Sequence, residues 1–223
     1  MKRIKLKDRV LPRYSAGEEI MNMVTHIVGG GMGALGLLVC LYQVLGSGDP
    51  FAIAGALIYG CSLIALYTVS SVYHGLKPSM GKKVLQIIDH CTIYLLIAGT
   101  YTPVALCLFR PAVPVLGWGM LAFQWVLAAV AVTLTAIDLK RYNVFSMICY
   151  IGMGWAVLPF LGLTRNLLGQ MGFLLLLLGG IAYTVGAVLY GIGSKKPWFH
   201  SVFHIFVVLG SVLQLLCVAF YVL

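Results

Sequence analysis

Three histidines are the side chains of this chain best suited to chemistry: His74, His200 and His204. The spacing His200-Ser-Val-Phe-His204 puts two imidazoles one turn apart on the same face of a helix, which suits metal ligation. Three neutral imidazoles and a water would complete a tetrahedral zinc site with an open position, the arrangement that catalytic zinc uses. Ionisable side chains inside apolar segments are costly and by default mark a functional site. The sequence therefore predicts a zinc site, provided that the fold brings the three histidines together.

The elements that must position these histidines are membrane-spanning helices. The chain has 223 residues, of which 61% are hydrophobic and 9% are charged. Apolar runs recur at the length of about 20 residues that a helix needs to cross a bilayer. We expect an all-α integral membrane protein, with a basic tail at 1–20 and a single transmembrane domain at 21–223. We expect this domain to be a seven-helix bundle with spans at about 21–45, 51–76, 84–109, 112–137, 143–163, 170–193 and 199–222.

The basic residues are divided unevenly between the two ends of the expected helices. Of the 15 Lys and Arg residues, all but Arg110 and Arg165 precede the first helix or follow the second, fourth and sixth helices. The positive-inside rule then places the N-terminus in the cytoplasm and the C-terminus outside. We therefore expect a multi-pass protein of the plasma membrane. This topology accounts for the net charge of +9 better than nucleic-acid binding does.

This orientation places several polar side chains in one cytoplasmic layer. His74 ends the second helix, Asp89 begins the third and His200 begins the seventh, each roughly 5–9 Å along its helix from a flanking lysine. Asp89 could hold a zinc-bound water and accept its proton. Ser70, one turn from His74, could add a hydrogen bond or serve as an oxyanion donor.

At these positions the chain resembles the hemolysin III family and, more broadly, the progestin and adipoQ receptor superfamily, whose distant relatives include the alkaline ceramidases. The resemblance runs from about residue 18 to the C-terminus. Four motifs carry it, in order and on the same side of the membrane: EEIMNMVTH with Glu19, Asn22 and His26, SSVYH with Ser70 and His74, IIDH with Asp89, and HSVFH with His200 and His204. It implies a seven-helix bundle with zinc on the three histidines, and Asp89 and Ser70 near the metal-bound water. It also implies hydrolysis of a lipid amide bond or a role in membrane-lipid homeostasis.

The remaining polar residues near this layer each have two interpretations. Glu19 is either part of the site or only a helix-start signal, since acidic side chains favour a helix N-terminus. His26 is either a fourth ligand or, as we expect, a polar neighbour of Glu19 or Asn22 that supports the site. His90 lies about 100° around its helix from Asp89, so we expect it to pack or hydrogen-bond elsewhere.

Two functions of different kinds fit these residues. The first is an integral-membrane zinc hydrolase of lipid amides or esters, because the connections are too short for an extramembrane pocket and a lipid could enter sideways between helices. The second is a non-enzymatic, receptor-like sensor or regulator of membrane-lipid homeostasis with a structural zinc. A haemolysin-type pore is disfavoured, because the outer parts of the spans hold almost no ionisable side chains. Membrane lipids are the expected partners, and a homo-oligomer is compatible with either function.

Overall fold

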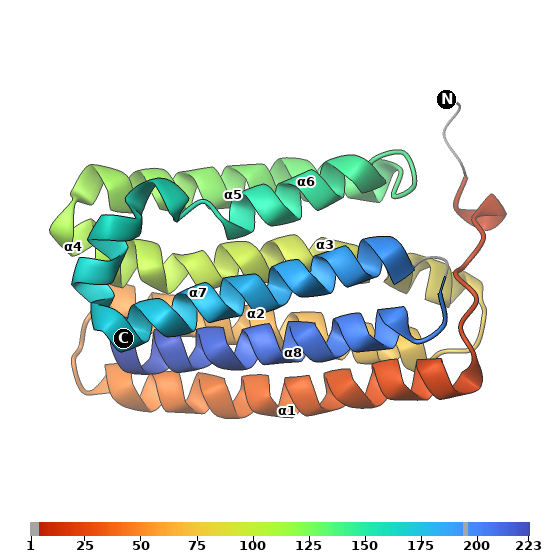
Figure 1. The fold of residues 1–223 in the computed structure, drawn as a ribbon, viewed down its shortest axis with the longest axis horizontal. Helices are drawn as coiled ribbons and strands as arrows, with labels where there is room; N and C mark the ends of the chain where they lie inside the picture. The colour runs from red at the N-terminus through yellow and green to blue at the C-terminus, as the bar shows by residue number, and fades with distance from the viewer. Residues whose placement is uncertain (1–4, 194–195) are drawn as a thin grey trace.

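The computed structural model describes residues 5–193 and 196–223, and over these ranges its regular structure is entirely helical. Lys2, Arg3 and Lys195, which contribute to the expected orientation, lie outside the described residues. The long helices run side by side and form a bundle with two ends (Figure 1). Their bounds are Ala16–Leu45 (α1), Pro50–Gly75 (α2), Met80–Pro103 (α3), Pro114–Ile137 (α5), Asn143–Gly154 (α6), Leu161–Gly193 (α7) and Phe199–Cys217 (α8). Short segments lie at Leu6–Asp8 (η1), Val104–Phe109 (η2), Arg110–Ala112 (α4), Leu158–Phe160 (η3) and Val218–Val222 (η4).

Six segments of the described chain are long and apolar enough to cross a membrane. One of them, Asn143–Ile192, has 50 residues. A continuous helix of that length would measure roughly 75 Å, whereas the hydrocarbon core of a bilayer is about 30 Å thick. The segment is not continuous, because α7 runs back in the direction opposite to α6 (Figure 1). The expected spans at 143–163 and 170–193 both lie within this one segment.

The reversal between α6 and α7 has local causes in the sequence. Pro159 lies in η3, and proline cannot donate the backbone hydrogen bond that continues a helix. Gly169 has φ 69° and ψ 179°, a conformation open to glycine and strained for other residues. The helix expected at 143–163 therefore ends at Gly154, and the returning helix is regular only beyond Gly169.

Glycines let the first three long helices approach one another closely. A Cβ atom added to Gly29 in α1 would overlap the ring of Tyr67 in α2. A Cβ atom on Gly55 in α2 would lie 3.1 Å from the Cα atom of Pro103 in α3. Small residues at such contacts are typical of helix packing in membranes. The close contacts fix how the ends of α1, α2 and α3 lie relative to one another.

The residues of the predicted site lie at one end of the bundle. The N-terminal segment lies there, α2 and α7 end there, and α3 and α8 begin there (Figure 1). The C-terminus lies at the opposite end (Figure 1). Among the described basic residues, only Arg110 and Arg165 belong to elements at the C-terminal end. The positive charge and the histidines are therefore on the same end, which we call the N-terminal end of the bundle.

Candidate metal centre

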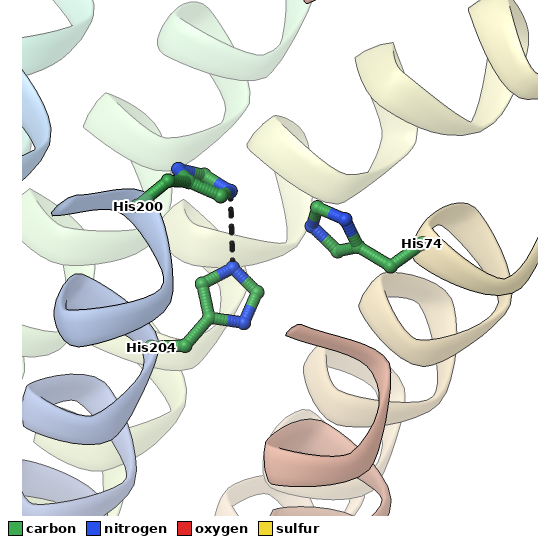
Figure 2. Close-up of side chains that lie close together, drawn as sticks. All are labelled: His74, His200 and His204. Atoms are coloured by element: carbon green, nitrogen blue, oxygen red, sulfur yellow. Dashed lines mark hydrogen bonds between the residues drawn. The ribbon is translucent and has the colours of Figure 1, made fainter. Parts of the chain in front are cut away.

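The three histidines predicted from the sequence lie together at the N-terminal end of the bundle. His74 is in the last turn of α2, and His200 and His204 are in the first two turns of α8. One ring nitrogen of each lies within 4.8 Å of the others. The Nε2 atoms of His200 and His204 are 3.1 Å apart. Figure 2 shows the three rings arranged around a common point, with His74 opposite the pair on α8.

His74 offers a free nitrogen to this group. Its Nδ1 lies 2.7 Å from Oε2 of Glu19 and, because a carboxylate can only accept, Nδ1 donates the proton. The side-chain amide of Asn22 lies 3.4 Å from the same nitrogen. Nε2 of His74 is buried and has no hydrogen-bond partner in the part of the chain that the structure describes. A carboxylate that fixes the far nitrogen of a histidine is a typical support for a metal ligand.

The donor set fits a divalent metal ion. Imidazole nitrogens around a tetrahedral zinc ion, at 2.0–2.1 Å from the metal, lie about 3.3 Å from one another. The observed spacing of up to 4.8 Å exceeds this value by about 1.5 Å at most, so the three rings are close to, but not in, a tetrahedral arrangement. Three imidazoles without a ligating carboxylate favour zinc over the harder divalent metals.

Glu19 also binds a buried lysine that the sequence analysis did not identify. Nζ of Lys82 lies 2.6 Å from Oε1 of Glu19 and donates to the backbone carbonyl of Leu76 at 2.9 Å. Lys82 is only 4% exposed, and a buried ammonium group requires such partners. A signal was present in the sequence, because Lys82 precedes Asp89 by two helical turns and so lies on the same face of α3.

The two adjacent glutamates at the start of α1 have different roles. Glu18 is the helix-start residue, since its side chain and that of Ser15 form a capping box. Oε1 of Glu18 also accepts a hydrogen bond from the backbone N–H of Trp198 at 2.7 Å, which ties the start of α1 to the start of α8. Glu19, one residue later, faces His74 and Lys82 instead. The capping signal and the contact with the histidine cluster therefore belong to different residues.

Asp89 and Ser70 lie beside the histidines and share a cavity with two of them. The cavity has a volume of about 150 Å³ and is lined by Ser70, Asp89, His200 and His204 among others. The Ser70 hydroxyl lies near the Asp89 carboxyl group, although the pair does not form a hydrogen bond of good geometry. Elsewhere the lining is mostly apolar and aromatic, from α3, α6, α7 and α8. It extends to Gln214, roughly 15 Å along α8 from His204.

The two other histidines lie next to the cluster without joining it. His26 stacks on His204 with ring centroids 3.8 Å apart. Within the described residues neither nitrogen of His26 has a hydrogen-bond partner, so the contact expected with Glu19 or Asn22 is replaced by ring stacking. Nδ1 of His90 lies 2.8 Å from the carbonyl of Gln86, and Nε2 of His90 lies 3.2 Å from the Tyr190 hydroxyl. His90 is thus hydrogen-bonded away from the three converging rings.

The N-terminal segment contributes an aromatic ring to this region. Tyr14 stacks on His200, with ring centroids 4.8 Å apart and an interplanar angle of 17°. Its centroid lies 5.9 Å from that of His74. Burial raises the pKa of the Tyr14 phenol, so the ring carries no charge at neutral pH. No sequence pattern marks this tyrosine, apart from its place directly before Ser15, the N-cap of α1.

Comparison with known proteins shows that nearly the whole chain is similar to one protein family. Residues 14–215 match the family model described as Haemolysin-III related. The chain is 39% identical to Hemolysin-3 of Bacillus cereus over 207 residues, 92% of each protein. It is 36% identical to the Hemolysin-3 homolog of Bacillus subtilis (strain 168) over 208 residues, 93% of this chain and 96% of that protein. It is also 31% identical to the monocyte to macrophage differentiation factor of Homo sapiens over 160 residues, 68% of this chain and 63% of that protein.

Proposed function

Because this multi-pass membrane protein belongs to the Haemolysin-III related family, we propose that it binds zinc in the plasma membrane and hydrolyses a lipid amide or ester bond there. The observation that carries the proposal is the meeting of three imidazoles, two of which line an apolar cavity together with Asp89 and Ser70. Structural zinc sites are closed by four protein ligands, whereas catalytic sites use three and keep one position open. Three histidines next to a cavity match the catalytic arrangement.

In the proposed reaction, each side chain around the histidines would have a different role. Zinc on three imidazoles would lower the pKa of a water towards 7 and polarise a substrate carbonyl. Asp89 would accept a proton from the attacking water and pass it to the leaving amine or alcohol. The Ser70 hydroxyl would hold the Asp89 carboxyl group in place or donate to the developing oxyanion. Glu19 would keep His74 in the tautomer that leaves Nε2 free.

The cavity favours an amphiphilic substrate. The Asp89 carboxyl group and the lining histidines lie at one end of it, and the deeper lining is mostly apolar and aromatic. A lipid whose amide or ester group lies at the histidines would place its hydrocarbon chain along that deeper part. Both α6 and α7 line the cavity together with α3 and α8, and α6 and α7 make few contacts with each other. Entry between these two helices would let a lipid reach the site without leaving the bilayer.

We also propose seven spans, with the N-terminus in the cytoplasm and the C-terminus outside. The reversal of direction between α6 and α7 supports two crossings within Asn143–Ile192. The basic residues at the N-terminal end of the bundle support the orientation, since cytoplasmic connections carry the excess of Lys and Arg. This topology places the metal centre near the cytoplasmic face.

A structural zinc in a lipid sensor is the alternative, because a metal on His74, His200 and His204 would join α2 to α8 whether or not it catalyses a reaction. Asp89→Asn separates the two functions. The amide has the same shape and can still hydrogen-bond, but it cannot take a proton. We expect wild-type zinc content with loss of hydrolysis by about 100-fold or more. Ser70→Ala should lower hydrolysis in the same direction by a smaller factor.

The measurement is zinc content by elemental mass spectrometry, together with fatty-acid release from amide-linked and ester-linked membrane lipids. Asp8→Asn is the matched control, since it makes the same chemical change at an exposed position before α1. Full hydrolysis in Asp89→Asn would eliminate Asp89 as the general base. A zinc-loaded wild-type protein that releases no fatty acid from either lipid class would support the structural alternative.

A further inference from the structure

The segment before α1 crosses the N-terminal end of the bundle beside the metal centre (Figure 1). We call residues 5–15 the strap. Nζ of Lys83, near the start of α3, donates to the carbonyl of Lys7 in the strap at 2.6 Å. At its other end the strap joins α1 through the Ser15 capping box. Between these two attachments, Tyr14 lies on the histidine cluster.

His200 differs from the other two histidines in what holds its ring. His74 is fixed by its hydrogen bond to Glu19, and His204 is buried and stacked on His26. His200 is only partly buried, and among the described residues its hydrogen-bonded contact is the Nε2 atom of His204. Its ring faces are covered by aromatic neighbours instead. Among the described contacts Tyr14 is the most nearly parallel to the His200 ring, at 4.8 Å and 17°, whereas the His204 ring lies 4.7 Å away at 61°.

Besides the tilted rings of His74 and His204, two further rings of the bundle lie near His200. The ring of Tyr190 in α7 lies 5.8 Å from it at 54°, and that of Phe203 lies 5.5 Å from it at 40°. Both contacts are tilted, so within the described residues Tyr14 is the one ring that stacks nearly parallel to His200. Because stacked aromatic rings attract each other beyond their buried area, Tyr14 restricts rotation of the His200 ring. Removal of Tyr14 would free the ring and expose one of its faces.

We propose that the strap, through Tyr14, holds His200 in its metal-binding orientation and shields the metal centre from the aqueous N-terminal end. The shielding rests on the stack alone, whereas the effect on metal retention also rests on the proposed zinc site. Metal ligands are normally oriented by a partner at their far nitrogen, and loss of that partner weakens metal binding. At His200 the stacked ring takes the place of this partner. Tyr14 is therefore a positioning residue, and lipid access from the bilayer does not require the strap to move.

Chemical modification of histidine tests the shielding without metal and without activity. Metal-free protein in detergent is treated with diethyl pyrocarbonate, and the rates at His200 and His90 are measured by peptide mass spectrometry. Tyr14→Ala should raise the rate at His200 roughly three- to tenfold, and Tyr14→Phe should stay within about twofold of wild type because it keeps the ring. His90 serves as the internal reference for an intact fold. An unchanged rate at His200 in Tyr14→Ala, with His90 also unchanged, overturns the proposal.

A second variant loosens the strap while Tyr14 stays in place. Lys83→Ala removes the hydrogen bond to the Lys7 carbonyl. It should raise the rate at His200 by a smaller factor than Tyr14→Ala does. Lys77→Ala is the matched control, because Lys77 is an exposed lysine in the connection just before α3. Equal rates at His200 in the two lysine variants would show that the attachment at Lys83 does not hold the strap.

Zinc release tests the positioning role. Zinc-loaded protein is mixed with excess chelator, and we expect roughly tenfold faster release from Tyr14→Ala and release at the wild-type rate from Tyr14→Phe. Tyr42→Ala, which changes an 87% exposed tyrosine of α1, is the control. Equal release from wild type and Tyr14→Ala refutes the positioning role. A wild-type protein that takes up no zinc refutes the metal site instead, and the modification experiment still decides the shielding.

Discussion

Glu19→Gln tests whether a buried ion pair holds a metal ligand in place. The Glu19 carboxylate lies 2.7 Å from Nδ1 of His74 and 2.6 Å from Nζ of Lys82. Glutamine keeps the shape of the side chain but has no charge and only one acceptor oxygen. Its amide nitrogen can only donate, so it repels either the Lys82 ammonium group or the N–H of His74. One of the two neighbours therefore loses its partner.

The expected loss of stability in Glu19→Gln depends on how deeply the ion pair between Glu19 and Lys82 is buried. Removing one partner of a fully buried ion pair costs about 3–5 kcal/mol. The Glu19 side chain is 22% exposed, and Lys82 keeps its hydrogen bond to the Leu76 carbonyl, so both water and the backbone reduce the loss. We expect Glu19→Gln to lower the free energy of unfolding by about 2–3 kcal/mol. Loss of the support for His74 should weaken zinc binding by about 10- to 100-fold.

The assay combines zinc competition against a chromophoric chelator with thermal unfolding of the metal-free protein in detergent. Asp8→Asn controls for the removal of one negative charge at an exposed position. Adding Lys82→Met to Glu19→Gln removes the unpaired ammonium group and should recover most of the unfolding temperature. It should not restore zinc affinity, because His74 still lacks its carboxylate. Wild-type zinc affinity in Glu19→Gln would refute the assignment of Glu19 as the group that orients His74.

Two further predictions concern the ligands and the topology. Alanine at any one of the three clustered histidines should remove most of the zinc, because two imidazoles hold a divalent metal much more weakly than three. His90→Ala should retain the zinc, and elemental analysis that finds full zinc without His200 and His204 would contradict the site. Reporter fusions should place residues 78, 141 and 197 in the cytoplasm, and residues 166 and 223 outside. A cytoplasmic reporter at residue 166 would contradict two crossings within Asn143–Ile192.

The class of fold could be predicted from the sequence because it depends on local properties. Apolar runs near the length that crosses a bilayer require helices, since backbone polar groups in lipid must be satisfied within the chain. The candidate ligands were also visible locally, because ionisable residues are rare in such runs and His200 and His204 are four residues apart. The segment at 143–192 was harder, because proline and glycine mark its breaks without showing where the chain turns.

What only the tertiary structure decided is which side chains meet around the histidines. Glu19 and Lys82 are 63 residues apart, and their contact depends on how α1 and α3 are rotated about their axes. Hydropathy does not determine that rotation; packing does, for example where Gly29 accepts the ring of Tyr67. The stacking of Tyr14 on His200 depends in the same way on the path of a segment with no apolar periodicity. The sequence could therefore identify the three histidines as candidate metal ligands, whereas their supporting contacts follow from helix packing.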